Sequence, residues 1–69
     1  MKNTYKVRLF LEESAGIIIE YTIIKVNAFR AYDEALERYK IADWDGYKID
    51  RAEVYNTKNN KMVYAVKTA

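Results

Sequence analysis

Apolar side chains in this chain repeat with two periods, and the order of those periods is the strongest constraint on the fold. Residues 5–12 alternate between apolar and polar side chains, and residues 17–26 form a second, β-branched segment. A period of two is typical of strands with one buried face. Residues 29–42 carry apolar side chains at helical spacing, and two more strand-like segments follow at 47–56 and 61–67. The predicted order is ββαββ.

This order predicts an α+β fold: a four-stranded antiparallel sheet with one α-helix packed on one face. The chain has 69 residues, which is near the lower limit for a single hydrophobic core, so we expect one domain over residues 1–69. A helix of about fourteen residues is about 21 Å long and covers one face of such a sheet. We therefore expect the other face to be open.

The first predicted hairpin turns at residues 14–16, a Ser-Ala-Gly connection. A three-residue loop that ends in glycine is typical of a hairpin with a G1 bulge. The register that this loop predicts pairs apolar residues on one buried face: Leu11 with Ile19, Leu9 with Tyr21, and Val7 with Ile23. Near Ile24 the apolar residues change parity, which predicts a bulge or a change of twist.

The predicted helix has an apolar face and a charged face. Asn27 is the best candidate for its N-cap, and residues 45–46, Asp-Gly, predict its end. The apolar face is made of Phe29, Tyr32, Ala35, Leu36, Tyr39 and Ala42.

The second predicted hairpin turns at residues 57–60, which are rich in turn formers. A four-residue loop predicts that Val54 lies opposite Val63 and Ala52 opposite Ala65, facing the helix. The predicted open face then carries the apolar residues Phe10, Ile18, Ile24, Tyr55, Met62, Tyr64 and Val66. The charged residues predicted among them are Lys6, Arg8, Glu12, Glu20, Arg51 and Glu53.

Several apolar side chains on adjacent strands form a patch of the kind that marks an interaction site. A domain this small, without a disulfide, also gains stability when a partner covers such a patch. We expect the open face to bind a protein partner or a second copy of the chain through Arg8, Phe10, Tyr55, Met62 and Tyr64. The alternative is an ordinary amphipathic sheet surface.

A second candidate contact lies at residues 43–47, where the only tryptophan, Trp44, stands between Asp43 and Asp45 and is followed by Tyr47. Trp and Tyr are enriched among the residues that dominate binding energy at interfaces. Trp is also highly buried on average, which favours a place at the end of the core. Both alternatives are open for Trp44.

The composition argues against catalysis. The chain has no cysteine and no histidine, which excludes a disulfide, a thiolate nucleophile and the usual proton shuttle. The two glycines form no phosphate-binding loop, and residues 43–46 lack the later ligands of a calcium loop, because Tyr47 and Val54 stand at those positions. We expect no enzyme activity, no catalytic residue, no cofactor and no metal.

Nucleic acid is the second choice of partner. Phe10, Tyr55 and Tyr64 on a sheet beside basic residues resemble the general arrangement that stacks single-stranded bases. The carboxylates predicted on the same face oppose phosphate binding, and the 12 basic and 10 acidic residues are interspersed along the chain.

These features predict a non-enzymatic protein-binding module that acts as an inhibitor or adaptor by occluding a partner. The small size and a composition typical of AT-rich genomes suggest, as the most specific hypothesis, a phage-encoded antagonist of a host or defence protein. The chain has no long apolar segment and begins without a signal-peptide pattern, so we expect a cytoplasmic protein without membrane contact.

Overall fold

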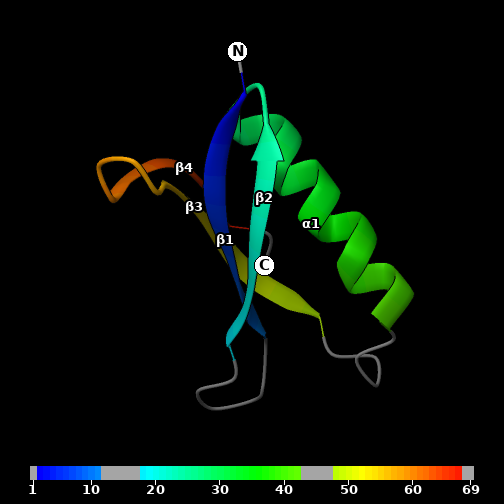
Figure 1. The fold of residues 1–69 in the computed structure, drawn as a ribbon. Helices are drawn as coiled ribbons and strands as arrows, with labels where there is room; N and C mark the ends of the chain where they lie inside the picture. Colours follow the sequence, from blue (N-terminus) through cyan, green and yellow to red (C-terminus); the bar gives the residue numbers. More distant parts are fainter. Residues whose placement is uncertain (1, 12–17, 43–47, 68–69) are drawn as a thin grey trace.

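The computed structural model describes residues 2–11, 18–42 and 48–67. The sheet has the strand order β2-β1-β3-β4, and all neighbouring strands are antiparallel (Figure 1). The elements are β1 (Asn3–Leu11), β2 (Ile18–Lys25), α1 (Ala28–Ala42), β3 (Ile49–Asn56) and β4 (Lys61–Lys67). This confirms the predicted ββαββ order and the α+β fold. The predicted turn at residues 14–16 and the helix stop at residues 45–46 lie outside the described residues.

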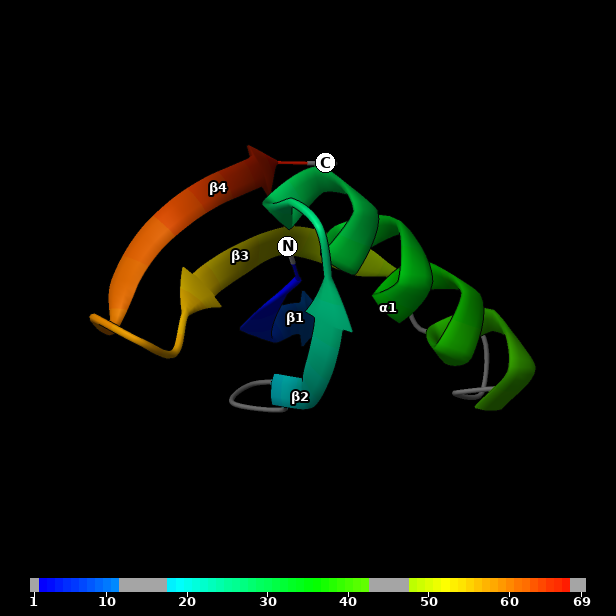
Figure 2. The ribbon, with the colours of Figure 1, turned by 45° about the horizontal axis from the view of Figure 1, so that its top comes forward.

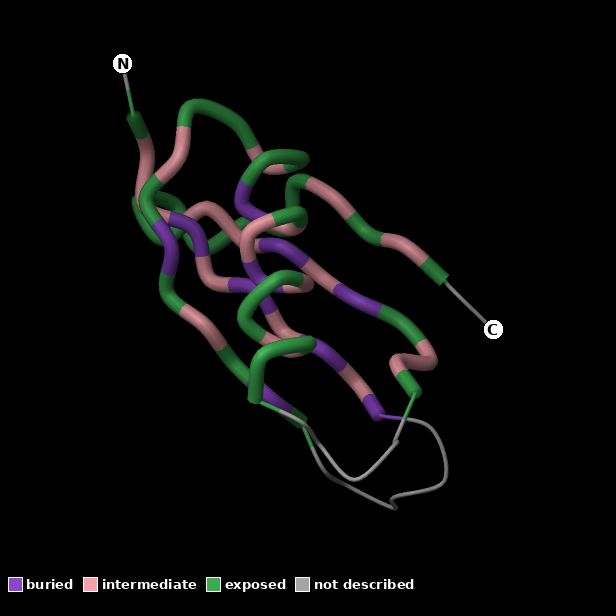
Figure 3. Tube along the Cα trace, turned by 90° about the vertical axis from the view of Figure 1, so that its right-hand side faces the viewer, coloured by how far each residue is buried: buried purple, intermediate pink, exposed green. Residues whose placement is uncertain are grey.

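The core lies between α1 and the inward-facing side of the sheet, and the sheet curves so that β4 bends away from β2 (Figure 2). Ala31 and Ala35 are fully buried, and these small side chains let the helix backbone approach the strands closely. Figure 3 shows buried residues along the centre of the molecule and exposed ones on the outer side of the helix. The buried strand residues are Tyr5, Val7, Leu9, Leu11, Ile19, Ile23, Ala52 and Val54.

The helix begins where its predicted cap stands but buries a different strip of its surface. The backbone N–H of Arg30 donates to Oδ1 of Asn27 at 2.9 Å, the geometry of an N-cap. Ala31, outside the predicted apolar face, is buried, whereas Phe29 and Ala42 are exposed. The prediction was wrong at both ends of that face, because the helix comes closest to the sheet along its alanines and not along its larger residues.

The first hairpin pairs with a register two residues away from the predicted one. Val7 lies opposite Tyr21 and Leu9 opposite Ile19. A shift of two residues keeps each side chain on its predicted face, so the buried face is as expected. The bulge predicted near Ile24 is absent, since Thr4 pairs with Ile24 in an unbroken ladder.

The second hairpin contains an irregularity that the sequence analysis did not anticipate. Asn56 pairs with Lys61 and Tyr55 with Met62, as predicted, but the register shifts between Val54 and Tyr55. Beyond this bulge Val54 lies opposite Tyr64 instead of Val63, and Ala52 lies opposite Val66 instead of Ala65. A shift of one residue reverses the face of every following side chain in β4.

The turn between β3 and β4 is built from asparagine side chains. Oδ1 of Asn56 accepts from the N–H of Lys58 at 2.9 Å, and Oδ1 of Asn59 accepts from the N–H of Lys61 at 3.1 Å. Asn60 has a φ of 57°, a left-handed conformation that asparagine tolerates better than most residues. The predicted turn at 57–60 is confirmed.

Candidate functional site: the open face of the sheet

The open face is the side of the sheet that α1 does not cover. It is formed by Lys6, Arg8 and Phe10 of β1, Ile18, Glu20, Thr22 and Ile24 of β2, Arg51, Glu53 and Tyr55 of β3, and Met62, Val63, Ala65 and Lys67 of β4. Among the described residues of this face, cations outnumber carboxylates four to two. The described part of the open face is therefore net positive.

The centre of the open face is a row of charged side chains across three strands. Arg8 of β1 lies opposite Glu20 of β2 on one side and Glu53 of β3 on the other. Nε of Arg8 is 2.8 Å from Oε2 of Glu20, and Nζ of Lys6 is 3.9 Å from Oε1 of the same carboxylate. The hydrogen bond to Glu20 raises the pKa of Arg8 above its ordinary value. Glu20 is thus neutralised by two cations of β1.

Tyr55 is held beside this row. Its hydroxyl donates to Oε1 of Glu53 at 2.8 Å, and this hydrogen bond, together with burial, raises the pKa of Tyr55. The guanidinium carbon of Arg8 lies 5.2 Å from the centre of the Tyr55 ring, within the range of a cation–π contact. Tyr55 therefore links the two charged strands in the middle of the sheet.

Phe10 makes a second cation–π contact on the open face. The guanidinium carbon of Arg51 lies 4.1 Å from the centre of the Phe10 ring, and the two residues are direct partners across β1 and β3. Phe10 and Tyr55, two aromatic residues predicted for the site, are thus each covered by an arginine.

The exposed aliphatic side chains lie at the two margins of the sheet. On β2, Ile18 and Ile24 are 49% and 60% exposed, and on β4, Met62 and Val63 are 53% and 47% exposed. The charged strands β1 and β3 separate these two groups. The apolar patch that the sequence predicted is therefore divided into two margins with a charged and aromatic centre.

Tyr64 and Val66 do not belong to the open face, which corrects their predicted placement. The Tyr64 ring contacts two rings of α1, Tyr32 at 5.7 Å and Phe29 at 6.1 Å between centroids. The bulge after Val54 is the cause, because it turns Tyr64 and Val66 toward the helix and Val63 and Ala65 away from it.

Sequence reasoning missed Val63, Ala65 and Lys67 as open-face residues. A signal of ambiguity was present, since β4 carries apolar residues at both parities. With neither parity polar, the alternation alone does not determine which side faces the helix.

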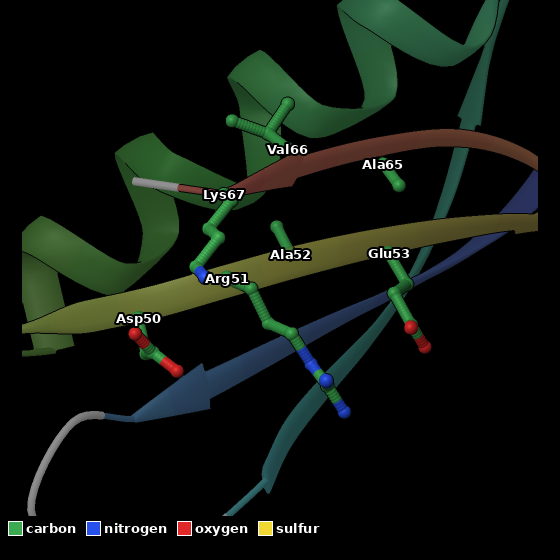
Figure 4. Close-up of a pocket in the computed structure, with 7 residues that line it drawn as sticks. All are labelled: Asp50, Arg51, Ala52, Glu53, Ala65, Val66 and Lys67. Atoms are coloured by element: carbon green, nitrogen blue, oxygen red, sulfur yellow. The ribbon is translucent and has the colours of Figure 1, made fainter. Parts of the chain in front are cut away.

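A hollow of about 350 Å³ lies where β3 and β4 run side by side. Figure 4 shows Arg51, Glu53, Ala65 and Lys67 pointing to one side of the sheet, and Ala52 and Val66 pointing to the other. The hollow brings two carboxylates together with two cations. Lys67, one of the two cations in the hollow, is exposed and lies on the edge strand β4.

The second candidate contact, formed by Asp43, Trp44, Asp45 and Tyr47, lies outside the described residues, as does Glu12. Among the described residues there is no group of three or more side chains suited to hold a metal ion. No helix in the described part of the chain is long and apolar enough to span a membrane.

Comparison with protein-family models, curated proteins and solved structures finds no significant match.

Proposed function

We propose that this chain is a non-enzymatic protein-binding module that docks its open face on an acidic surface of a partner protein and acts by occlusion. The observation that carries the proposal is the pairing of Phe10 with Arg51 and of Tyr55 with Arg8 on a face that no described element covers. Tyr and Arg are enriched in interfaces and among the residues whose truncation costs most binding energy.

The net positive charge of the described part of the open face supports an acidic partner. Arg51 and Lys67 form no ion pair within the described residues, so their charges are available to carboxylates of a partner. Pairing two open faces would bring together two surfaces of the same sign, which disfavours a face-to-face dimer. A different, acidic protein therefore fits the open face better than a second copy.

Single-stranded nucleic acid fits the geometry less well. A base that stacks on Phe10 or Tyr55 has to displace the arginine that covers the ring. Glu20 and Glu53 also stand in the central row, where they would repel a phosphate backbone. These contacts favour a protein partner.

Capture from host-cell lysate by the tagged chain tests this proposal when matched variants are compared. Phe10→Glu places a carboxylate at the centre of the open face, and Ile41→Glu makes the same kind of change at a helix residue that is 83% exposed. We expect wild type and Ile41→Glu to retain the same protein after nuclease treatment, and Phe10→Glu to lose it with an unchanged far-UV CD spectrum. Equal retention by all three, or loss of the protein with nuclease, contradicts the proposal.

A further inference from the structure

Strand β4 lies at the edge of the sheet and is the least packed strand. It pairs with β3 alone, and it is the one strand of the described sheet that contains no buried residue. The edge of β4 that points away from β3 makes no backbone hydrogen bond within the described residues. An edge of this kind presents unpaired N–H and C=O groups to which another extended segment can pair.

The side chains of β4 restrict which segment can pair there. Five residues, Met62 to Val66, are apolar or aromatic, and Lys61 and Lys67 stand at the two ends. Neither lysine forms an ion pair within the described residues. Residues 48–67 as a whole carry five cations and two carboxylates. The edge therefore offers an apolar stretch between two unneutralised positive charges.

The opposite edge strand, β2, lacks this property. Its two charged residues are both neutralised: Glu20 by Arg8 and Lys6, and Lys25 by Glu34 at 3.6 Å. Charge thus distinguishes the two edges of the sheet within the described residues.

We propose that β4 accepts an extended acidic segment of a partner protein as a fifth strand. The bulge puts Lys61 on the helix side of β4 and Lys67 on the open face, so carboxylates about five residues apart, roughly 17 Å along a strand and on opposite faces, would lie beside the two lysines. A second copy of β4 fits poorly. It brings two further lysines and no carboxylate to the edge, so it cannot neutralise Lys61 and Lys67.

This inference goes beyond the proposed function, because it uses the edge of the sheet instead of its open face. Lys67 belongs to both surfaces, but Lys61 is specific to the edge, and Phe10 and Arg51 are specific to the face. Each can therefore fail while the other holds.

Three capped peptides test the edge directly with the ¹⁵N-labelled full chain. The first is Glu-Val-Thr-Val-Thr-Glu, whose two carboxylates project from opposite faces of an extended strand. The second has lysine at both ends, and the third is the acidic peptide N-methylated at two adjacent central amides. We expect the acidic peptide to shift and protect amides of β4 and to bind about tenfold more tightly than the lysine peptide. The methylated peptide should not bind, because main-chain pairing is blocked on both of its edges.

Charge reversal gives the matched control. Lys61→Glu/Lys67→Glu should invert the preference, so that the lysine peptide binds more tightly than the acidic one. Lys2→Glu/Lys40→Glu makes the same change in net charge at exposed residues outside β4 and should leave the preference as in wild type. Equal binding of the acidic and lysine peptides, no binding at millimolar concentration, or shifts confined to Arg8, Phe10 and Arg51 would each overturn the edge proposal.

Discussion

Strands β1 and β4 are both rich in apolar residues but have very different surroundings. In β1 every second residue from Tyr5 to Leu11 is buried, and strands flank it on both sides. In β4 no residue is buried, and only β3 flanks it. A central strand is constrained by two ladders and a helix, whereas an edge strand has one ladder to satisfy. The edge strand is therefore the one whose surface is available to a partner.

The largest expected effect of a substitution follows from this contrast. Leu9→Ala in β1 removes a fully buried side chain and should lower the free energy of unfolding by about 2 to 5 kcal/mol. A chain of this length has a total stability of roughly 3 to 10 kcal/mol, so the loss is a large fraction. Val63→Ala in β4 should change it by about 0.5 kcal/mol or less. Urea denaturation measures both, and equal losses would contradict the contrast.

Substitutions at two neighbouring residues of β4 should also differ in how much they destabilise the fold, because one residue packs on α1 and the other does not. The expected difference is smaller than that between Leu9→Ala and Val63→Ala. Tyr64→Glu removes two aromatic contacts with α1, each of about 1 kcal/mol, and should destabilise the fold by about 2 kcal/mol. Val63→Glu, on the open face, should stay within about 0.5 kcal/mol of wild type. If Tyr64→Glu left the urea midpoint unchanged while Val63→Glu lowered it, β4 would face the other way.

The smallest effect concerns the packed side of the sheet at high pH. The Tyr39 hydroxyl is buried and has no hydrogen-bond partner among the described residues, and burial, with Tyr21 nearby, raises the pKa of Tyr39 above 10.0. As the pH rises, the unfolded chain loses this proton before the folded chain does. The free energy of unfolding is therefore unaffected by Tyr39 ionisation below pH 10 and falls as the pH rises toward the pKa of the folded state. Tyr39→Phe should stay within about 1 kcal/mol of wild type at pH 7 and reduce the loss above pH 10. Urea midpoints at several pH values check this, and an identical loss in both proteins would contradict it.

The helix could be placed from the sequence because its apolar residues recur at helical spacing, and β1, β2 and β3 because their buried residues recur at every second position. The alternation in β1 and β2 survives a register error of two residues, since side chains keep their faces. The cap at Asn27 also follows from local chemistry, because its side chain serves the backbone of the next turn. What failed was the face of β4, which depends on a bulge that no local pattern marks.

The candidate site was predictable in part for the same reason. Phe10 and Tyr55 lie on strands with a clear polar parity, and both are on the open face as predicted. Their contacts with Arg51 and Arg8 were not predictable, because they depend on the exact register of β1 against β3. The separation of the aliphatic residues into two margins likewise depends on the strand order β2-β1-β3-β4, which the order of segments along the chain does not determine.

The assignment of β4 side chains to the packed face and to the open face rests on the side from which Tyr64 projects. A NOESY spectrum of the labelled protein tests this most directly. We predict cross-peaks from the Tyr64 ring to the rings of Tyr32 and Phe29, whose centroids lie 5.7 and 6.1 Å away. Cross-peaks from Tyr64 to the side chains of Tyr55 and Arg8, with none to α1, would contradict the account and return Tyr64 to the open face.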